Sequence, residues 1–350
     1  MIRILTLVLF SYLIYCNYAF YHINLVTPYL SRLHGERNVR VFDDILSADN
    51  CRKVDSDAIY GGLGHTVFHR SIRPRTNIES TIDSILYELS DKSPIVEYWW
   101  RDEWISLELH KDVDEKLSQI EKLIRFPNHG HVLYLEVGEN VTGPTILFTE
   151  EQNWKQRSIG QFSEITIVPS VASRLLRFAG NMSHAVPRPA LAYLDPEEGG
   201  SNLELWSRRR DQDVRTPEFR SLRRSVLLFN TWHIPPYEIP SEPPEDAVRA
   251  YQTSESDPQS NPVRCYPFKQ WHICDIKNFN REQESISLDK MTNPDNNDNR
   301  DIRLKIGLLG DVQRRERVNR YLEVTVPIKS KQGFLSKRGL PTSFPINEMT

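Results

Sequence analysis

The sequence predicts a mainly β fold with flanking helices, of the α+β class. Short segments rich in β-branched, leucine and aromatic residues follow one another between Trp99 and Trp232, separated by Gly, Pro and Asn. Frequent short strands broken by turn residues are typical of a β-sandwich or barrel. With 350 residues, of which 39% are hydrophobic and 26% charged, the chain is long enough to bury one large core.

The folded part is predicted to begin with a strand and a helix. Residues 39–42 alternate between apolar and polar, as in a half-buried strand. Apolar residues then recur at helical spacing from Ile78 to Leu89, behind Asn77 as a candidate N-cap, and this helix is expected to pack on a sheet. The further predicted strands are 104–109, 132–137, 145–148, 164–168, 174–178, 190–194 and 225–230.

Three later segments interrupt or follow this pattern. Residues 195–222 are polar and read as a long loop inserted between two strands, and residues 235–301 read as a polar, partly disordered insertion that could act as a lid or docking arm. Residues 302–328 regain strand character and are expected to return to the main sheet, so that 39–232 and 302–328 form one domain. Residues 329–350 remain as a tail.

The N-terminus has the pattern of a targeting segment. Residues 1–19 comprise a short basic start, an apolar stretch and a small residue, Ala19, as in a secretory signal peptide. A cleaved signal would direct the protein to the endoplasmic reticulum lumen or outside the cell. Two alternatives stay open: an uncleaved signal anchor, which would be the protein's only contact with a membrane, and a bipartite organelle address.

Charge and cysteine content narrow the range of partners. The formal net charge is -3, from nearly equal numbers of basic and acidic residues, so no overall positive field favours nucleic acid or anionic lipid. Cys265 and Cys274 are close enough in sequence to pair in an oxidising compartment. The composition therefore predicts no nucleic-acid partner.

A histidine and an aspartate, His110 and Asp112, follow a predicted strand with H-x-D spacing. Residues i and i+2 of a strand project to the same side, so both side chains can reach one point. Two imidazoles and one carboxylate can occupy one face of an octahedral Fe(II) and leave the opposite face open. Taken alone, the pair reads as part of a surface loop, because charged residues surround it.

The amino-acid sequence that follows this pair resembles that of the prolyl 4-hydroxylase-like family of Fe(II)/2-oxoglutarate-dependent dioxygenases. The matching segments are residues 132–137, 143–148 and 174–187, and the last includes His184 in Asn181-Met-Ser-His184-Ala. The resemblance covers Val39 to Trp232. It implies a double-stranded β-helix, or jelly roll, with Fe(II) as metal, 2-oxoglutarate as co-substrate, dioxygen as oxidant and ascorbate as a further candidate cofactor.

The resemblance also implies roles for individual residues. His110, Asp112 and His184 match the iron ligands, and Arg224 matches the basic residue that holds the far carboxylate of 2-oxoglutarate. Tyr134 is similar to a tyrosine that hydrogen-bonds the same co-substrate, although a core aromatic is an equally good reading of it. Family members place the basic residue shortly after the distal histidine, whereas Arg224 lies 40 positions after His184.

Two further points about the site stay open. Arg223 is a near-equal candidate for the co-substrate arginine, because it lies on the opposite strand face and a one-residue misalignment would exchange the two. His129 and His131 form a rival metal pair, as do His65 and His69 at the i, i+4 spacing of a helix, but neither pair has a matching third ligand. Both are interpreted as structural or surface histidines.

The predicted activity is hydroxylation of a C–H bond with conversion of 2-oxoglutarate to succinate and carbon dioxide. A peptidyl proline in a peptide or protein is the leading substrate by resemblance, and a small molecule is the alternative. A second hypothesis is a non-catalytic jelly-roll interaction module derived from the same family. Three costly polar groups at one point argue against it, because a binding module has no physical need for them.

Overall fold

The computed structural model of the chain describes residues 39–61, 65–101, 107–138, 144–150, 162–186, 223–243, 245–256, 262–278, 302–307, 321–326 and 340–345. The chain divides into Met1–Val39 and Arg40–Thr350, and every described residue except Val39 belongs to the second unit. The predicted signal segment 1–19, the strand 190–194 and the loop 195–222 lie outside the described residues. Within those residues, no helix has the length and apolar character needed to cross a bilayer.

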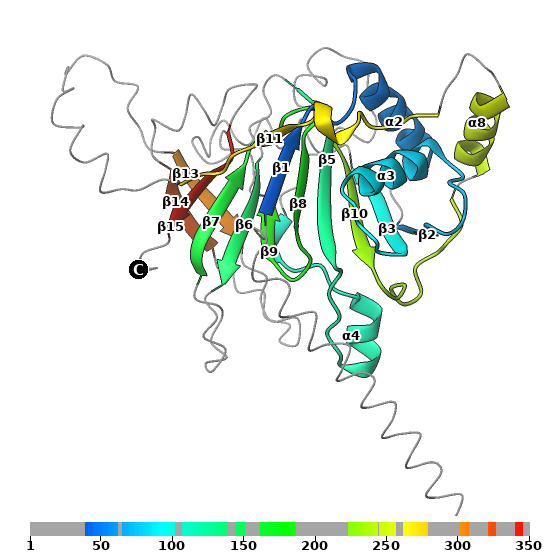
Figure 1. Cartoon of the computed structure of the whole chain (residues 1–350). Helices are drawn as coiled ribbons and strands as arrows, with labels where there is room; N and C mark the ends of the chain where they lie inside the picture. Colours follow the sequence, from blue (N-terminus) through cyan, green and yellow to red (C-terminus); the bar gives the residue numbers. More distant parts are fainter. Residues whose placement is uncertain are drawn as a thin grey trace, which may run out of the picture. The chain divides into compact units, whose positions relative to one another are not determined.

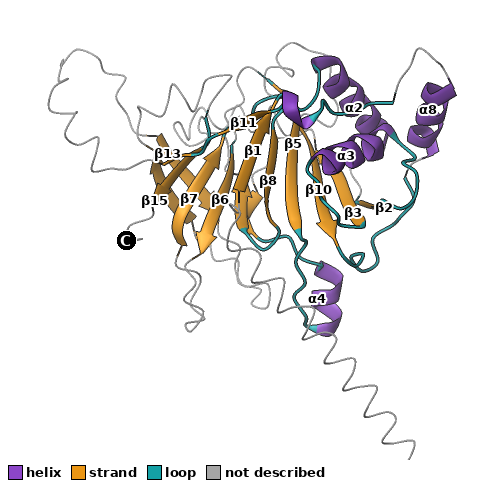
Figure 2. Cartoon of the chain, viewed as in Figure 1, coloured by secondary structure: helices purple, strands orange, loops and turns teal. Residues whose placement is uncertain are grey.

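Most strands belong to two large sheets (Figure 2). The seven-stranded sheet has the order β11-β1-β8-β5-β10-β3-β2, formed by His272–Cys274, Val39–Asp43, Leu175–Ala179, His129–Val137, Arg224–Trp232, Ile95–Arg101 and Thr66–His69. The six-stranded sheet has the order β12-β15-β7-β6-β9-β4, formed by Lys277–Asn278, Thr342–Pro345, Phe162–Val168, Thr145–Glu150, Ser183–Val186 and Leu107–His110. Strands β12 and β15 pair in parallel, whereas the pairs β1–β11, β10–β3, β10–β5, β15–β7, β2–β3, β4–β9, β5–β8, β6–β7 and β6–β9 are antiparallel.

The connectivity of the strands from β3 to β10 is that of a jelly roll. Apart from β6 and β7, which pair within one sheet, consecutive strands alternate between the sheets, so that β3, β5, β8 and β10 lie in one and β4, β6, β7 and β9 in the other. The resulting orders, β8-β5-β10-β3 and β7-β6-β9-β4, close two antiparallel four-stranded layers, as in a double-stranded β-helix. The predicted fold class is therefore confirmed.

Two helices cover one face of the seven-stranded sheet (Figure 1). Helix α2 (Ala48–Gly61) and helix α3 (Asn77–Glu88) share one apolar core with this face, in which Val54, Ile82, Leu133 and Phe229 are fully buried. Helix α3 begins one residue earlier than expected, because Thr76 is the N-cap and its hydroxyl accepts from the Glu79 N–H at 3.1 Å. These helices do not cover the opposite face of the sheet, which Tyr134 and Arg224 share. A short helix, α4 (Glu115–Glu121), follows β4.

The segment expected to be a polar insertion contributes to this core. Residues 235–278 include helix α8 (Glu245–Ser256) and a short 3-10 turn, η2 (Phe268–Gln270). Val263 and Trp271 are buried in the core, and β11 pairs with β1. These elements were not predicted, because the segment is polar and only a few of its apolar side chains are buried. Cys265 and Cys274, expected to be able to pair, form no disulfide.

The last strands are placed differently from the prediction. Strand β13 (Ile302–Gly307) pairs with β14 (Tyr321–Val326) in a sheet of their own, instead of returning to the main sheet. Within the segment expected to be a tail, residues 342–345 form β15, which pairs with β7. Pairing partners of such short strands depend on distant contacts that their own sequence does not reveal.

Candidate metal centre

Two neighbouring strands of the six-stranded sheet bring His110 and His184 together. His110 ends β4 and lies directly opposite His184 on β9, and the two imidazole rings have centroids 4.3 Å apart. Asp112 follows β4 by two residues, in the loop before α4. The H-x-D spacing thus places both side chains at the end of one strand, and strand pairing supplies the third group.

The three side chains offer donor atoms around one point. The Nε2 atoms of His110 and His184 each lie 3.8 Å from Oδ1 of Asp112, and the ligand atoms of all three lie within 4.8 Å of one another. Two ligands bound to one metal at about 2.1 Å lie about 3 to 4 Å apart. The donor set therefore fits a divalent transition metal, and two nitrogens with one carboxylate leave coordination positions open.

His184 is held with one ring nitrogen available for a metal. Its Nδ1 lies 3.2 Å from the carbonyl oxygen of Met182, and a carbonyl can only accept, so Nδ1 carries the proton and Nε2 keeps its lone pair. Burial lowers the pKa of His184; Asp112 opposes that shift and His110 adds to it. The neutral imidazole is the form that binds metals.

The loop that carries Asp112 is anchored by Asp114, the N-cap of α4. The Asp114 side chain is buried, and it accepts hydrogen bonds from the backbone N–H groups of Leu117 at 3.0 Å and Tyr237 at 3.1 Å. It also forms an ion pair with Arg125. These contacts hold the backbone next to the Asp112 carboxylate.

Arg224 on β10 points between the two sheets. Its guanidinium lies over the Tyr134 ring at 5.2 Å from the centroid and donates to the hydroxyls of Thr145 at 3.3 Å and Ser170 at 3.2 Å. The Tyr134 hydroxyl is 2.7 Å from that of Thr145. Burial lowers the pKa of Arg224 while Tyr134 opposes that shift, and a guanidinium stays charged in any case.

Arg223 faces the other way. It forms ion pairs with Asp55 of α2 at 2.6 Å and with Glu136. The neighbouring Ser225, on the same face, also donates to Asp55. Of the two candidate arginines, only Arg224 lies on the face toward the six-stranded sheet.

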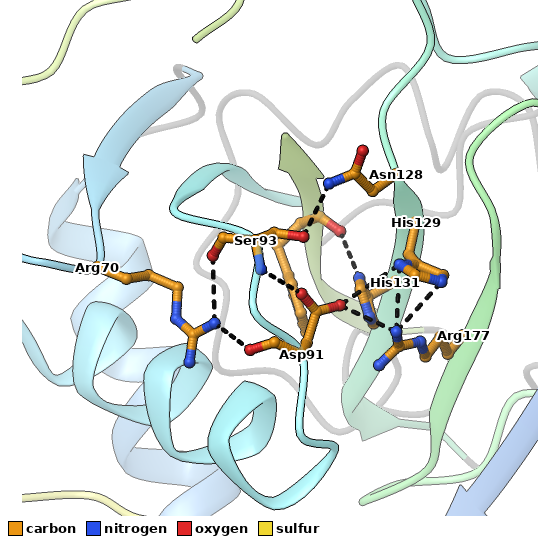
Figure 3. Close-up of polar contacts among 8 residues, drawn as sticks. Arg70, Asp91, Ser93, Asn128, His129, His131 and Arg177 are labelled. Carbon is orange, nitrogen blue, oxygen red and sulfur yellow. Dashed lines mark hydrogen bonds and ion pairs between the residues drawn. The ribbon is translucent and has the colours of Figure 1, made fainter. Parts of the chain in front are cut away.

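The rival histidine pairs lie elsewhere. His129 and His131 belong to a polar network with Asp91 and Arg177 on the helix-covered face of the seven-stranded sheet (Figure 3). His131 Nδ1 contacts the Phe229 carbonyl at 3.2 Å, and its ring stacks on the Phe229 ring at 4.4 Å.

The second rival pair is not helical. His65 precedes β2 and stacks on Trp99, whereas His69 ends β2, so the two do not share a helix face. Across the described part of the chain, the only group of three or more His, Cys, Asp or Glu side chains whose ligand atoms all lie within 4.8 Å of one another is His110, Asp112 and His184.

Sequence reasoning missed Thr145 and Ser170 as site residues. Thr145 starts β6, and Ser170 follows the end of β7 by two residues. Single hydroxyl residues carry no sequence signal of their own. They are recognised only because the sheets bring them against Arg224.

No protein-family model matches the chain, and no curated protein matches it in sequence. Solved structures to which it is similar include a Pseudomonas putida prolyl-4-hydroxylase, at 12% identity and a TM-score of 0.32, covering 57% of this chain and 90% of that one. HygX from Streptomyces hygroscopicus, with iron bound, has 9% identity and a TM-score of 0.28, with 58% and 84% covered.

The non-heme alpha ketoglutarate dependent epimerase SnoN, from nogalamycin biosynthesis, has 10% identity and a TM-score of 0.28, with 56% of this chain and 78% of that chain covered. All three likenesses are too distant to establish a family for this chain, and its chemistry has to be inferred from its own residues.

Proposed function

We propose that this protein is an Fe(II)- and 2-oxoglutarate-dependent oxygenase that hydroxylates a C–H bond. The observation that carries the proposal is the convergence of His110, Asp112 and His184 between paired strands, with ligand atoms within 4.8 Å of one another. When bound, Fe(II) with dioxygen and 2-oxoglutarate supplies the oxidising power for hydroxylation, with succinate and carbon dioxide as co-products.

The protein's own share begins with holding the metal. His110 and His184 would each offer Nε2, and Asp112 one carboxylate oxygen. The Met182 carbonyl fixes the His184 tautomer, and Asp114 fixes the loop beside Asp112. Outer contacts of this kind commonly change metal affinity by about 10- to 100-fold.

Arg224 would bind the far carboxylate of 2-oxoglutarate. A guanidinium pairs a carboxylate with two parallel hydrogen bonds, and the buried position strengthens that interaction. Tyr134, Thr145 and Ser170 surround the same guanidinium with hydroxyl groups. These hydroxyls orient Arg224 and offer further donors to the ligand.

The interior between the sheets limits the access of water to the site. Phe178 packs on His184 with ring centroids 5.0 Å apart, and Leu147 lies opposite His184 across the β6–β9 pair. Both side chains are buried. Low water content favours binding of a dicarboxylate to one arginine and protects reactive steps from side reactions.

By the sequence resemblance, a peptidyl proline is the first substrate to test. The non-catalytic alternative, an interaction module, predicts that the three ligand side chains can be replaced without effect on any chemistry. Its physical difficulty is the convergence of one buried and two partly buried polar groups, because both Asp112–histidine distances are 3.8 Å, longer than a hydrogen bond.

The test is succinate release from 2-oxoglutarate in the presence of Fe(II) and dioxygen. Wild-type protein is expected to release succinate slowly even without a primary substrate, and His184→Ala is expected to abolish release. His272→Ala, a change at an exposed histidine outside the site, is the matched control and should retain it. Equal release by His184→Ala and the wild type would refute the proposal.

A further inference from the structure

The inner face of β3 carries an arginine that the proposed reaction does not yet use. Trp100 points toward the helices, because its indole N–H contacts Ser225 at 2.8 Å and Asp55 of α2 at 3.3 Å. Neighbouring residues of a strand face opposite sides. Trp99 and Arg101 therefore lie on the face toward the site.

Strand register places Arg101 in one row with a residue of the site. Arg101 is directly opposite Val226 on β10, and Val226 is opposite Tyr134 on β5. Directly opposed residues share a sheet face. Since the Tyr134 hydroxyl reaches Thr145 in the other sheet, this row faces the space between the sheets.

Charges of the site act on Arg101. Burial lowers its pKa; the carboxylate of Asp112 opposes that shift, and the positive charge of Arg224 adds to it. Arg101 thus lies within electrostatic range of both a metal-ligating residue and the co-substrate arginine. It is half-buried, and no hydrogen bond or ion pair joins its side chain to another residue in the described ranges.

A second donor on the same face is also without a partner. The Trp99 side chain is more than nine-tenths buried, and its indole N–H makes no hydrogen bond within the part of the chain that the structure describes. A buried donor without an acceptor costs free energy, and such groups are often completed by a ligand. Arg101 and Trp99 together offer N–H donors to an acceptor that enters between the sheets.

These donors are separate from the co-substrate position. Arg224 directs its donors to Thr145 on β6 and Ser170 after β7. Strand β10 lies between β5, which carries Tyr134, and β3, which carries Arg101. The two arginines thus flank the site from different strands, and one dicarboxylate already has its partner in Arg224.

We propose that Arg101 binds an acidic group of the primary substrate, with the Trp99 indole N–H as an additional donor. The proposal rests on the proposed function and names its substrate class: a molecule that carries a carboxylate near the C–H bond to be hydroxylated. The carboxylate belongs either to an acidic residue of a peptide or to a small free acid. A guanidinium suits this task because its planar fork pairs a carboxylate with two hydrogen bonds.

The experiment compares two probes that differ only in charge, 4-fluorophenylacetate and 4-fluorophenylacetamide. Their affinities are measured by fluorine NMR titration of the full chain loaded with Zn(II) and 2-oxoglutarate, which binds but does not turn over. We expect the acid to bind about tenfold more tightly than the amide, since a charge-assisted pair is worth about that factor. Arg101→Gln should reduce the ratio to about one.

Two further variants serve as controls for this titration. Arg52→Gln removes an exposed arginine of α2 and should leave the acid-to-amide ratio unchanged. Arg101→Lys keeps a positive charge without the planar fork and should therefore retain a reduced preference for the acid. That result would show that the preference lost in Arg101→Gln is not lost through misfolding. Thermal unfolding of each variant is followed in parallel.

The outcomes separate this inference from the proposed function. No preference for the acid in the wild type, or an unchanged preference in Arg101→Gln, overturns the role of Arg101. A loss of 2-oxoglutarate affinity in Arg101→Gln as large as in Arg224→Gln also overturns it, because Arg101 would then belong to the co-substrate. If the protein binds neither Zn(II) nor 2-oxoglutarate, the proposed function fails, and the same titration of metal-free protein still decides whether Arg101 selects the acid.

A matched pair of short peptides identifies the source of the carboxylate. Each contains proline, and they differ only by glutamate or glutamine beside it. Preference for the glutamate peptide that disappears in Arg101→Gln assigns the group to a peptide. Preference confined to the fluorinated acid assigns it to a small free acid.

Discussion

Two clusters in this molecule each contain two histidines and an aspartate, and only one of them is suited to a metal. In the first, His110, Asp112 and His184 approach one another without closing hydrogen bonds, since both nitrogen–oxygen distances are 3.8 Å. In the second, Asp91 and His129 share the guanidinium of Arg177, at 2.9 Å and 3.1 Å. In the second cluster, the Arg177 guanidinium already contacts both Asp91 and His129.

The contrast shows that composition of a cluster does not decide its function. Burial of Asp91 acts to raise the pKa of its carboxyl, but the hydrogen bond with His129, the positive charge of Arg177 and the hydrogen bonds with Ser93 together hold that pKa well below its usual range. The first cluster has no built-in arginine within the triad, and its charge balance would be completed by a metal. The four predictions below test this difference.

The largest effect is expected on metal affinity. His184→Ala removes one of three ligands, so Fe(II) affinity under anaerobic conditions should fall by a factor of about 100 or more. His129→Ala, the equivalent change in the second cluster, should leave the affinity within about twofold. Equilibrium dialysis measures both, and equal losses in the two variants would remove the distinction between the clusters.

The second cluster should instead control stability. Asp91→Ala leaves the buried Arg177 without its carboxylate and should lower the free energy of unfolding by about 3 kcal/mol. Urea denaturation measures this loss, and Fe(II) affinity of the folded variant should not change. Asp49→Ala, which breaks an exposed pair with Arg52, is the control and should cost less than about 0.5 kcal/mol. Similar losses in both variants would contradict the structural role of Asp91.

Arg223 and Arg224, at the start of β10, should also differ in function: Arg223 should affect stability and Arg224 co-substrate binding. Arg224→Gln is expected to weaken 2-oxoglutarate binding by about 10- to 100-fold, because a charge-assisted pair with a carboxylate is lost. Arg223→Gln breaks the ion pairs with Asp55 and Glu136, so it should lower thermal stability and leave co-substrate affinity nearly unchanged. Calorimetric titration with 2-oxoglutarate decides; a larger loss of affinity in Arg223→Gln would reverse the assignment.

The smallest effect is a pH dependence from His131. Burial holds the pKa of His131 well below its usual range, Arg177 and His129 add to that shift, and Asp91 opposes it. Above about pH 6.5 the residue is neutral in both states; below it only the unfolded state gains the proton, so His131 lowers the free energy of unfolding by about 1.4 kcal/mol per pH unit.

The measurement is the slope of unfolding free energy between pH 7 and pH 5 in wild type and in His131→Phe. The variant should have the shallower slope, because Phe cannot take up a proton. Phe can also keep the stacking that His131 makes with Phe229. An equal slope in both proteins would show that His131 is not held neutral.

Part of the fold could be predicted because local patterns sufficed. Strands such as β6 and β7 have β-branched and aromatic residues bounded by turn signals, and helix α3 has regular apolar spacing. Strand β3 was missed altogether, although Ile95-Val-Glu-Tyr-Trp-Trp has strong β propensity. Trp271 and Val263 were missed because isolated apolar residues in a polar segment give no periodic signal.

The candidate residues of the site could be predicted from the sequence, but their arrangement in space could not. The H-x-D spacing and the sequence around His184 predicted three candidate ligands, since strand geometry places i and i+2 on one side. Alternation also placed Arg223 and Arg224 on opposite faces, but it could not decide which face is covered by helices. Asp55 of α2, which pairs with Arg223, decides it, and this contact joins residues far apart in the sequence.

A crystal structure of the protein soaked anaerobically with Fe(II) tests the metal assignment most directly, because anomalous scattering locates iron without prior assumptions. We predict one iron peak, bound by Nε2 of His110, Nε2 of His184 and a carboxylate oxygen of Asp112, at about 2.0 to 2.2 Å from each. A peak bound by His129 and His131, or no peak near the triad at saturating Fe(II), would contradict it.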